Sequence, residues 1–171
     1  IQDIITSDLG WTYEHCFPSV TTVPPAENLS LNIERIKSVV LEKMAADSDW
    51  RHSAAVMINN PHNASGTKIP TDELKDLLGS LLTNDLYVID DLAYQDVGPY
   101  ADIKRIETCK ELVHDLWKKG KLTGIQRDRL ITIHSLSKTD SFAGARLAVA
   151  DIPDNRLAQQ FQKATEHILP N

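Results

Sequence analysis

The sequence is poor in cysteine, with only Cys16 and Cys109 among its 171 residues and no Cys-x-x-Cys pair. A disulfide-built scaffold or a zinc ribbon is therefore excluded, and we expect a reducing compartment. The six histidines show no two-ligand helical spacing. We accordingly expect no metal site.

Long apolar runs are also lacking, since none approaches the roughly 18 residues that a membrane helix needs, and the chain opens without a signal-peptide pattern. Basic residues are in deficit: Lys and Arg number 18 against 24 Asp and Glu, a formal net charge of −6. A duplex-DNA binder would need a basic face. A hydrophobic content of 42% with 25% charged residues is ordinary globular usage. We expect a cytoplasmic protein with neither a membrane nor a nucleic-acid partner.

Apolar periodicity predicts strands and helices in alternation, with no internal repeat or linker to divide the chain. The expected strands are residues 19–23, 54–59, 86–90, 129–134 and 146–150. The expected helices are residues 31–44 (capped by Ser30 or Asn32), 71–82 (capped by Thr71), 101–119 (stopped by Gly120) and 155–168. This order predicts one α/β domain with a mainly parallel sheet flanked by helices.

Polar side chains gather directly after three of the predicted strands. They are Asn60 to Gly66 after the 54–59 strand, Asp90, Asp91 and Tyr94 at the end of the 86–90 strand, and Ser135, Ser137 and Lys138 after the 129–134 strand, with Arg146 farther on. Ligands of open α/β sheets bind beyond the carboxyl ends of the strands. We therefore expect a ligand site at this edge.

The residue types at this edge indicate a particular cofactor. Ser135, Ser137 and Arg146 suit a phosphate. Lys138, held near an arginine and desolvated, would have a lowered pKa and act as a nucleophile toward a carbonyl. Asp91 suits a cationic ring nitrogen. Phosphate, aldehyde and protonated pyridine together describe pyridoxal 5′-phosphate (PLP).

Three motifs carry a resemblance to a known family. Residues 134–146 (HSLSKTDSFAGAR) resemble the S-x-S-K-…-G-x-R motif of class I/II aminotransferases, which are fold-type-I PLP enzymes. Residues 60–66 (NPHNASG) resemble the family's N-P-H-N-P-T-G loop, with Ala64 in place of proline, and residues 90–94 (DDLAY) resemble its D-x-A-Y strand end. The motifs follow the family's order, and the resemblance spans about residues 20–169.

The resemblance implies a role for each site residue. Lys138 forms the Schiff base with PLP, Asp91 pairs with the pyridine nitrogen, and Asn63 and Tyr94 hydrogen-bond the ring oxygen. The phosphate is held by Ser135, Ser137 and Arg146. Amino acids and 2-oxo acids are the implied substrates, and a homodimer is implied at full length.

The resemblance also implies that residues 1–171 are part of an aspartate aminotransferase-like large domain. The family's glycine-rich phosphate loop and its ring-stacking aromatic are expected upstream, and its small domain with the substrate-carboxylate arginine is expected downstream. The segment 98–124 is longer than the family pattern suggests. We expect such a fragment to be inactive alone.

Simpler roles stay open for several of these residues. Asp91 or its neighbour Asp90 suits a helix cap, Asn63 a turn, Tyr94 a half-buried core position and Ser137 a backbone-capping hydroxyl. For His62, a solvated loop position is expected rather than contact with the cofactor.

Two other functions use the same motifs. One is a different fold-type-I PLP reaction, that of a carbon–sulfur β-lyase, a decarboxylase or a cyclopropane-forming synthase. The other is an effector-sensing domain fused to a winged-helix unit in a transcriptional regulator.

Overall fold

The computed structural model describes residues 1–10, 12–94, 107–136, 144 and 147–166. Within them the strands are β1 (Asp3–Ser7), β2 (Ser19–Val23), β3 (Ala54–Asn59), β4 (Tyr87–Asp91), β5 (Leu130–Ser135) and β6 (Ala148–Asp151). The helices are α1 (Ile33–Ala46), the 3₁₀ turn η1 (Trp50–Ser53), α2 (Thr71–Thr83), α3 (Cys109–Lys118), the single turn α4 (Gly124–Arg127) and α6 (Asn155–Glu166).

The six strands form one sheet in the order β2-β1-β3-β4-β5-β6. All pairs are parallel except β5–β6, which is antiparallel. The α/β fold with a mainly parallel sheet is therefore confirmed. Strand β1 was not predicted, and it lies between β2 and β3 in the sheet.

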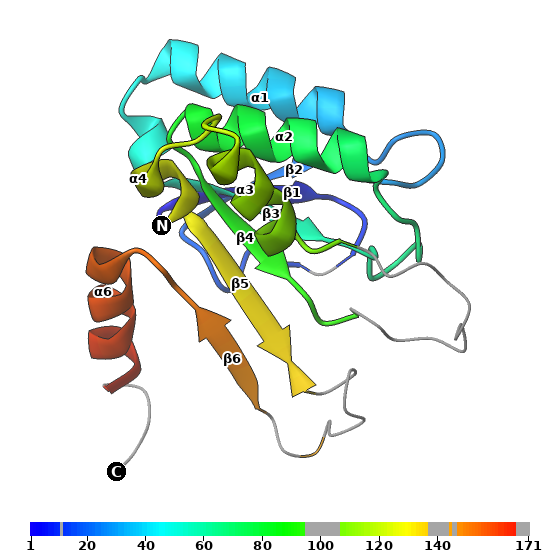
Figure 1. Cartoon of the computed structure of the whole chain (residues 1–171). Helices are drawn as coiled ribbons and strands as arrows, with labels where there is room; N and C mark the ends of the chain where they lie inside the picture. Colours follow the sequence, from blue (N-terminus) through cyan, green and yellow to red (C-terminus); the bar gives the residue numbers. More distant parts are fainter. Residues whose placement is uncertain (11, 95–106, 137–143, 145–146, 167–171) are drawn as a thin grey trace.

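Helices α1, α2 and α3 cover one face of this sheet, as Figure 1 shows. Alternate strand residues such as Ile5, Val56 and Val88 pack against these helices in the larger hydrophobic core. We call this side the helix face. A smaller cluster on the other side contains five buried strand residues: Ile4, Ala55, Met57, Ile89 and Ile131. We call this second side the pocket face.

Helix boundaries follow from local capping. The side chain of Asn32 accepts a hydrogen bond from Arg35 N–H, so Asn32 is the cap of α1. The prediction that Thr71 caps α2 was wrong: Thr71 is the first helical residue, and Pro70 occupies the cap position without a side-chain bond. Proline suits the start of a helix because the N–H that it lacks would have no partner within the helix there.

Two predicted helices extend beyond what can be described. For the 101–119 helix, residues 101–106 lie outside the described part, and α3 begins at Cys109 behind a capping box formed by Thr108 and Glu111. Gly120 follows with φ +68, the left-handed conformation that favours glycine after a helix. The 155–168 helix is described as far as Glu166.

Within the described residues, no helix is both long and apolar enough to cross a membrane.

Candidate active site

The site lies at the carboxyl ends of β1, β3, β4 and β5. Because side chains alternate along a strand, Asn59 follows Met57 onto the pocket face, and Asp91 follows Ile89 onto the same face. Ser135 follows Ile131 and Ile133 in the same way. The fold thus places three polar side chains from neighbouring strand ends on one side of the sheet.

A pocket opens at this edge of the sheet, between the end of β1 and the loop after β3. Its lining combines strand ends with two loops: Thr6, Ser7, Leu9, Gly10, Tyr13, Leu31, Met57, Asn59, His62 and Asn63. The predicted residue Asn63 is therefore a lining residue. Thr6, Ser7 and Tyr13 were not predicted, because their position depends on β1.

Asn63 is held by a short contact at the base of its loop. Its backbone N–H donates to Asn59 Oδ1 at 2.6 Å. The loop starts with the cis peptide bond between Asn60 and Pro61, and Asn60 Oδ1 accepts from Ile69 N–H at 3.0 Å. Ala64 is exposed, so the residue that replaces the family's proline lies at the loop surface.

His62 is only 9% exposed, so the prediction of a solvated loop histidine was wrong. Its Nδ1 lies 3.2 Å from Ser65 Oγ. A Cβ added at Gly10 would lie 3.7 Å from its Nε2. Burial lowers the pKa of His62, against a smaller opposite effect from the backbone of Leu9. The His62 ring is thus packed between the loop after β3, to which it belongs, and the loop after β1, which contains Gly10.

Asp91 is a half-buried carboxyl at the end of β4. Burial raises its pKa, and the hydrogen bond that Ala93 N–H donates to Asp91 Oδ1 at 3.1 Å only partly opposes this rise. No cation among the described residues forms an ion pair with it, as judged from residues 1–94 (without 11), 107–136, 144 and 147–166. A cationic partner on the pocket face would stabilise its charged form.

Asp90 differs from its neighbour because it follows Val88 onto the helix face. It is 1% exposed, and burial raises its pKa to about 7, with a further small rise from Asp91. Cys109 opposes that rise, yet neither carboxyl oxygen makes a hydrogen bond of full geometry within the described residues. Asp90 therefore lies away from the pocket.

Tyr13 is the aromatic residue of the pocket. Burial raises its pKa to about 12, and the charge of Asp91 is the next cause, followed by Cys16. The ring packs against the pocket-face cluster. The Tyr13 phenol, on which the charge of Asp91 acts, gives the site an aromatic wall. The only signal for it in the sequence is an aromatic residue that follows β1, a strand that was not predicted.

The remaining predicted residues are partly described. Tyr94 is half-buried in the turn after β4, and Ser135 ends β5. Ser137, Lys138 and Arg146 lie outside the described residues. The chain nevertheless leaves β5 and enters β6 at this same edge, because Leu136 N–H donates to Leu147 O at 3.2 Å.

Metal ligands do not gather in the described part of the chain: no three His, Cys, Asp or Glu side chains there could hold an ion together. The polar groups described at this edge are instead the Asp91 carboxyl, the asparagine-rich loop after β3, the Tyr13 phenol and the Ser135 hydroxyl.

The comparisons with known proteins agree with this fold. The chain resembles the aromatic aminotransferase from Pyrococcus horikoshii OT3 with a TM-score of 0.65 at 22% identity, over 96% of this chain and 41% of that one. It resembles a PLP-bound putative aminotransferase from Clostridium difficile 630 with a TM-score of 0.69 at 18% identity, over 98% and 40%. A PLP-bound C-S lyase from Staphylococcus hominis gives a TM-score of 0.68 at 18% identity, over 95% and 38%.

These likenesses define the fold as that of the PLP-dependent aminotransferase-like proteins. The family model for aminotransferase class I and II matches residues 17–169, and the chain belongs to this family. An aspartate aminotransferase from Pyrococcus abyssi is 28% identical over 123 residues, which are 72% of this chain and 26% of that protein. The family and its PLP-bound neighbours confirm PLP as the cofactor.

Proposed function

We propose that this chain is the PLP-binding part of an aminotransferase that transfers the amino group of an amino acid to a 2-oxo acid. The observation that carries the proposal is Asp91: a half-buried carboxyl on the pocket face, with a raised pKa and no cationic partner among the described residues. The pyridine nitrogen of PLP, when protonated, is a cation that would fit this place. Asn63, Tyr13 and Asn59 line the pocket beside it.

Each predicted residue has a place in this proposal. Asp91 would hold the proton on the ring nitrogen, and Asn63 and Tyr94 would donate to the ring oxygen. Ser135, Ser137 and Arg146 would hold the phosphate. Tyr13 would supply an aromatic wall within this chain, where the sequence led us to expect the stacking aromatic farther upstream.

Lys138 would attach the cofactor and then act as the base. Bound PLP supplies a ring that accepts electrons from the substrate's α-carbon. Lys138 Nζ would remove the proton from that α-carbon and hold it for return. For this work its pKa must fall below the usual value near 10.4, which desolvation and a nearby Arg146 would achieve.

The chain spans about a quarter of the curated relative and about two-fifths of the similar solved structures. We propose a cytoplasmic homodimer, with amino acids and 2-oxo acids as substrates, in which residues 1–171 form part of the large domain. The segments that complete the site would come from the rest of that protein.

Borohydride reduction tests the central assignment. The full-length protein is loaded with PLP, reduced and digested, and its peptides are mapped by mass spectrometry. The pyridoxyl group is expected on Lys138, and Lys138→Ala should remove the label, whereas Lys121→Ala serves as a control that should not. A label on any other lysine would overturn the assignment.

A carbon–sulfur lyase is the second candidate, and the similarity to the Staphylococcus hominis C-S lyase favours it. A product assay separates the two, because a lyase releases a thiol and ammonia together with pyruvate and needs no acceptor. An aminotransferase instead moves the amino group to an acceptor 2-oxo acid and releases neither a thiol nor ammonia. Decarboxylase, cyclopropane-forming and effector-sensing functions have no further observation in their favour.

A further inference from the structure

We propose that Asn59 is a positioning residue that holds Asn63 and Asp91 at a fixed separation. Asn59 is the last residue of β3 and lines the pocket. Its side chain makes two hydrogen bonds: Oδ1 accepts from Asn63 N–H at 2.6 Å, and Nδ2 donates to Asp91 O at 2.9 Å. One amide group thus bridges the two elements that carry the proposed ring contacts.

The two partners fix the orientation of the amide. A backbone N–H can only donate and a backbone carbonyl can only accept, so the oxygen of Asn59 must face Asn63 and its nitrogen must face Asp91. Asparagine presents one acceptor and two donors on a single rigid plane. Aspartate has the same shape but offers only acceptors when ionised, and alanine offers neither.

The bridge lies where the regular sheet ends. Asn59 and Asp91 are the last paired residues of the β3–β4 ladder. Beyond Asp91 the chain turns, with Ala93 N–H donating to Asp91 Oδ1 and Leu92 N–H donating to Ile133 O at 2.9 Å. Where the backbone pairing of β3 and β4 ends, the Asn59 side chain therefore links the end of β4 to the loop that carries Asn63.

The inference rests on the proposed function for its consequence. If Asn63 meets the ring oxygen and Asp91 meets the ring nitrogen, the two contacts lie at different positions of one rigid ring, and their separation must match that ring. Asn59 would set this match without touching the reacting atoms. It is a positioning residue and not a catalytic one.

Amide hydrogen exchange of the 171-residue chain, measured by NMR, tests the bridge. In Asn59→Ala, exchange at Asn63 N–H should rise about two- to twelvefold, since one lost hydrogen bond is worth about 0.5–1.5 kcal/mol. Exchange at Ala93 N–H should rise as well, because the turn after Asp91 loses the bond that holds the Asp91 carbonyl. In Asn59→Asp, Asn63 N–H should stay protected because its acceptor remains, while Ala93 N–H should exchange faster. Val88 N–H, which donates to Arg129 O at 3.1 Å away from the bridge, reports global opening. In Asn59→Ala, exchange at Asn63 N–H should rise by more than exchange at Val88 N–H.

A pH titration separates positioning from general stability. Asn59→Asp places a second carboxylate beside Asp91 on the same face, so the pKa of Asp91 should rise further, as followed by its ¹³C carboxyl signal. The control is Asn84→Asp: Asn84 Nδ2 also donates to a backbone carbonyl, Ser80 O at 2.8 Å, but at the end of α2. Asn84→Asp should leave Asp91 and both amides unchanged.

Equal exchange at Asn63 in wild type and Asn59→Ala, or an unchanged Asp91 pKa in Asn59→Asp, would overturn the bridge. Neither measurement uses the cofactor. A failed Lys138 label with an intact exchange pattern would therefore count against the proposed function and not against the bridge.

Discussion

Asp90 and Asp91 are consecutive carboxyls that meet different surroundings because β4 turns them to opposite faces. Asp91 lies on the pocket face, where Asn59 Nδ2 donates to its backbone carbonyl and its charge acts on Tyr13. Asp90 is enclosed against α3, where Cys109 is 2% exposed. The sequence alone left both open as a helix cap. Strand alternation now gives each carboxyl a distinct chemical environment.

The first residue-scale prediction concerns Asp91. In the full-length, PLP-loaded enzyme, Asp91→Ala should lower turnover by orders of magnitude while the cofactor stays bound, because breaking a buried, hydrogen-bonded pair costs about 3–5 kcal/mol. Steady-state kinetics and the absorbance of bound PLP measure the two effects. Asp90→Asn is the matched control and should keep turnover within a few-fold of wild type; the reverse pattern would reject the assignment.

Asp90 should make the stability of the fold depend on pH. Its folded pKa of about 7 lies above the ordinary value of 3.8, so between these values the folded chain binds a proton that the unfolded chain has lost. Stability should therefore fall as pH rises through this window, by up to about 1.4 kcal/mol per pH unit, and level off above it. Urea unfolding at several pH values measures the slope.

Asp90→Asn should flatten that slope, because an amide does not titrate. Asp91 has a raised pKa as well, and it contributes with the same sign; Asp91→Asn therefore serves as the comparison and should leave most of the slope in place. A slope that is unchanged in Asp90→Asn would show that Asp90 titrates normally.

Elements whose own residues carry a strand or helix pattern were predictable, whereas elements that depend on neighbouring strands were not. Strands β2 and β3 were predicted to the residue: β2 is a β-branched run that ends before two prolines, and β3 is a continuous apolar run. Strand β1 was missed: its sequence DIITS mixes polar and apolar residues, and it is buried only because β2 and β3 enclose it. Tyr13 was missed with it.

The same reasoning applies to the last strand and to the site. The 146–150 strand was expected, but its antiparallel direction is a property of the sheet and not of its own residues. Asp91 and Asn63 were found from residue type and motif. Asn59 could not be singled out, because its role depends on two hydrogen bonds across neighbouring strands.

Helix α3 gives an element-scale prediction. Thr108 Oγ1 accepts from Glu111 N–H at 3.1 Å, and Thr108 N–H donates to Glu111 Oε2 at 2.9 Å. Thr108→Ala should destabilise the fold by about 1 kcal/mol, which lowers Tm by roughly 2–4 °C for a chain of this size. Thermal unfolding followed by circular dichroism measures this. Thr108→Ser keeps the hydroxyl and should restore most of the loss.

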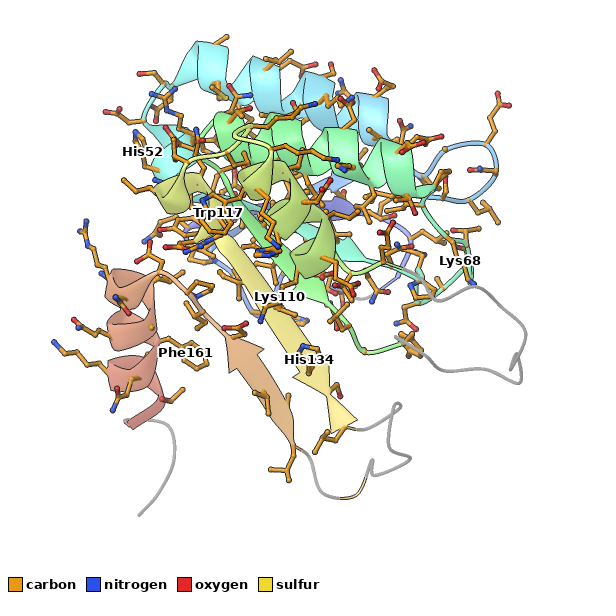
Figure 2. The ribbon with its side chains drawn as sticks, viewed as in Figure 1. His52, Lys68, Lys110, Trp117, His134 and Phe161 are labelled. Carbon is orange, nitrogen blue, oxygen red and sulfur yellow. The ribbon has the colours of Figure 1, made fainter. Side chains whose placement is uncertain are left out.

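At the scale of the molecule, one side of the sheet is less covered than the other. The edge strand β6 exposes Val149 by 60%, and α6 carries Phe161, labelled in Figure 2, at 50% exposure. Exposed apolar groups on an edge strand and its neighbouring helix favour association. These groups lie on the elements that follow the Lys138 motif.

The molecule-scale prediction is that the 171-residue chain alone shows no aminotransferase activity and binds PLP weakly or not at all. Asn63 and Tyr13 line the described pocket, and Asp91 lies on the same face of the sheet. These residues would contact the cofactor from one side, and an incompletely enclosed cofactor stays in contact with water. Absorbance during PLP titration of the purified chain measures binding. Saturation at low micromolar PLP, with turnover of any amino acid, would contradict the prediction.

The antiparallel β5–β6 pair bears on the order in which the sheet assembles. Ser135 pairs with Ala148 across a short connection, whereas Asp3 pairs with Ala54 only after β2 and α1 have been traversed. Closing a short loop costs less chain entropy than closing a long one. The segment that carries Lys138 is thus enclosed by a local pairing, so its two ends can meet before the distant strands have found their neighbours.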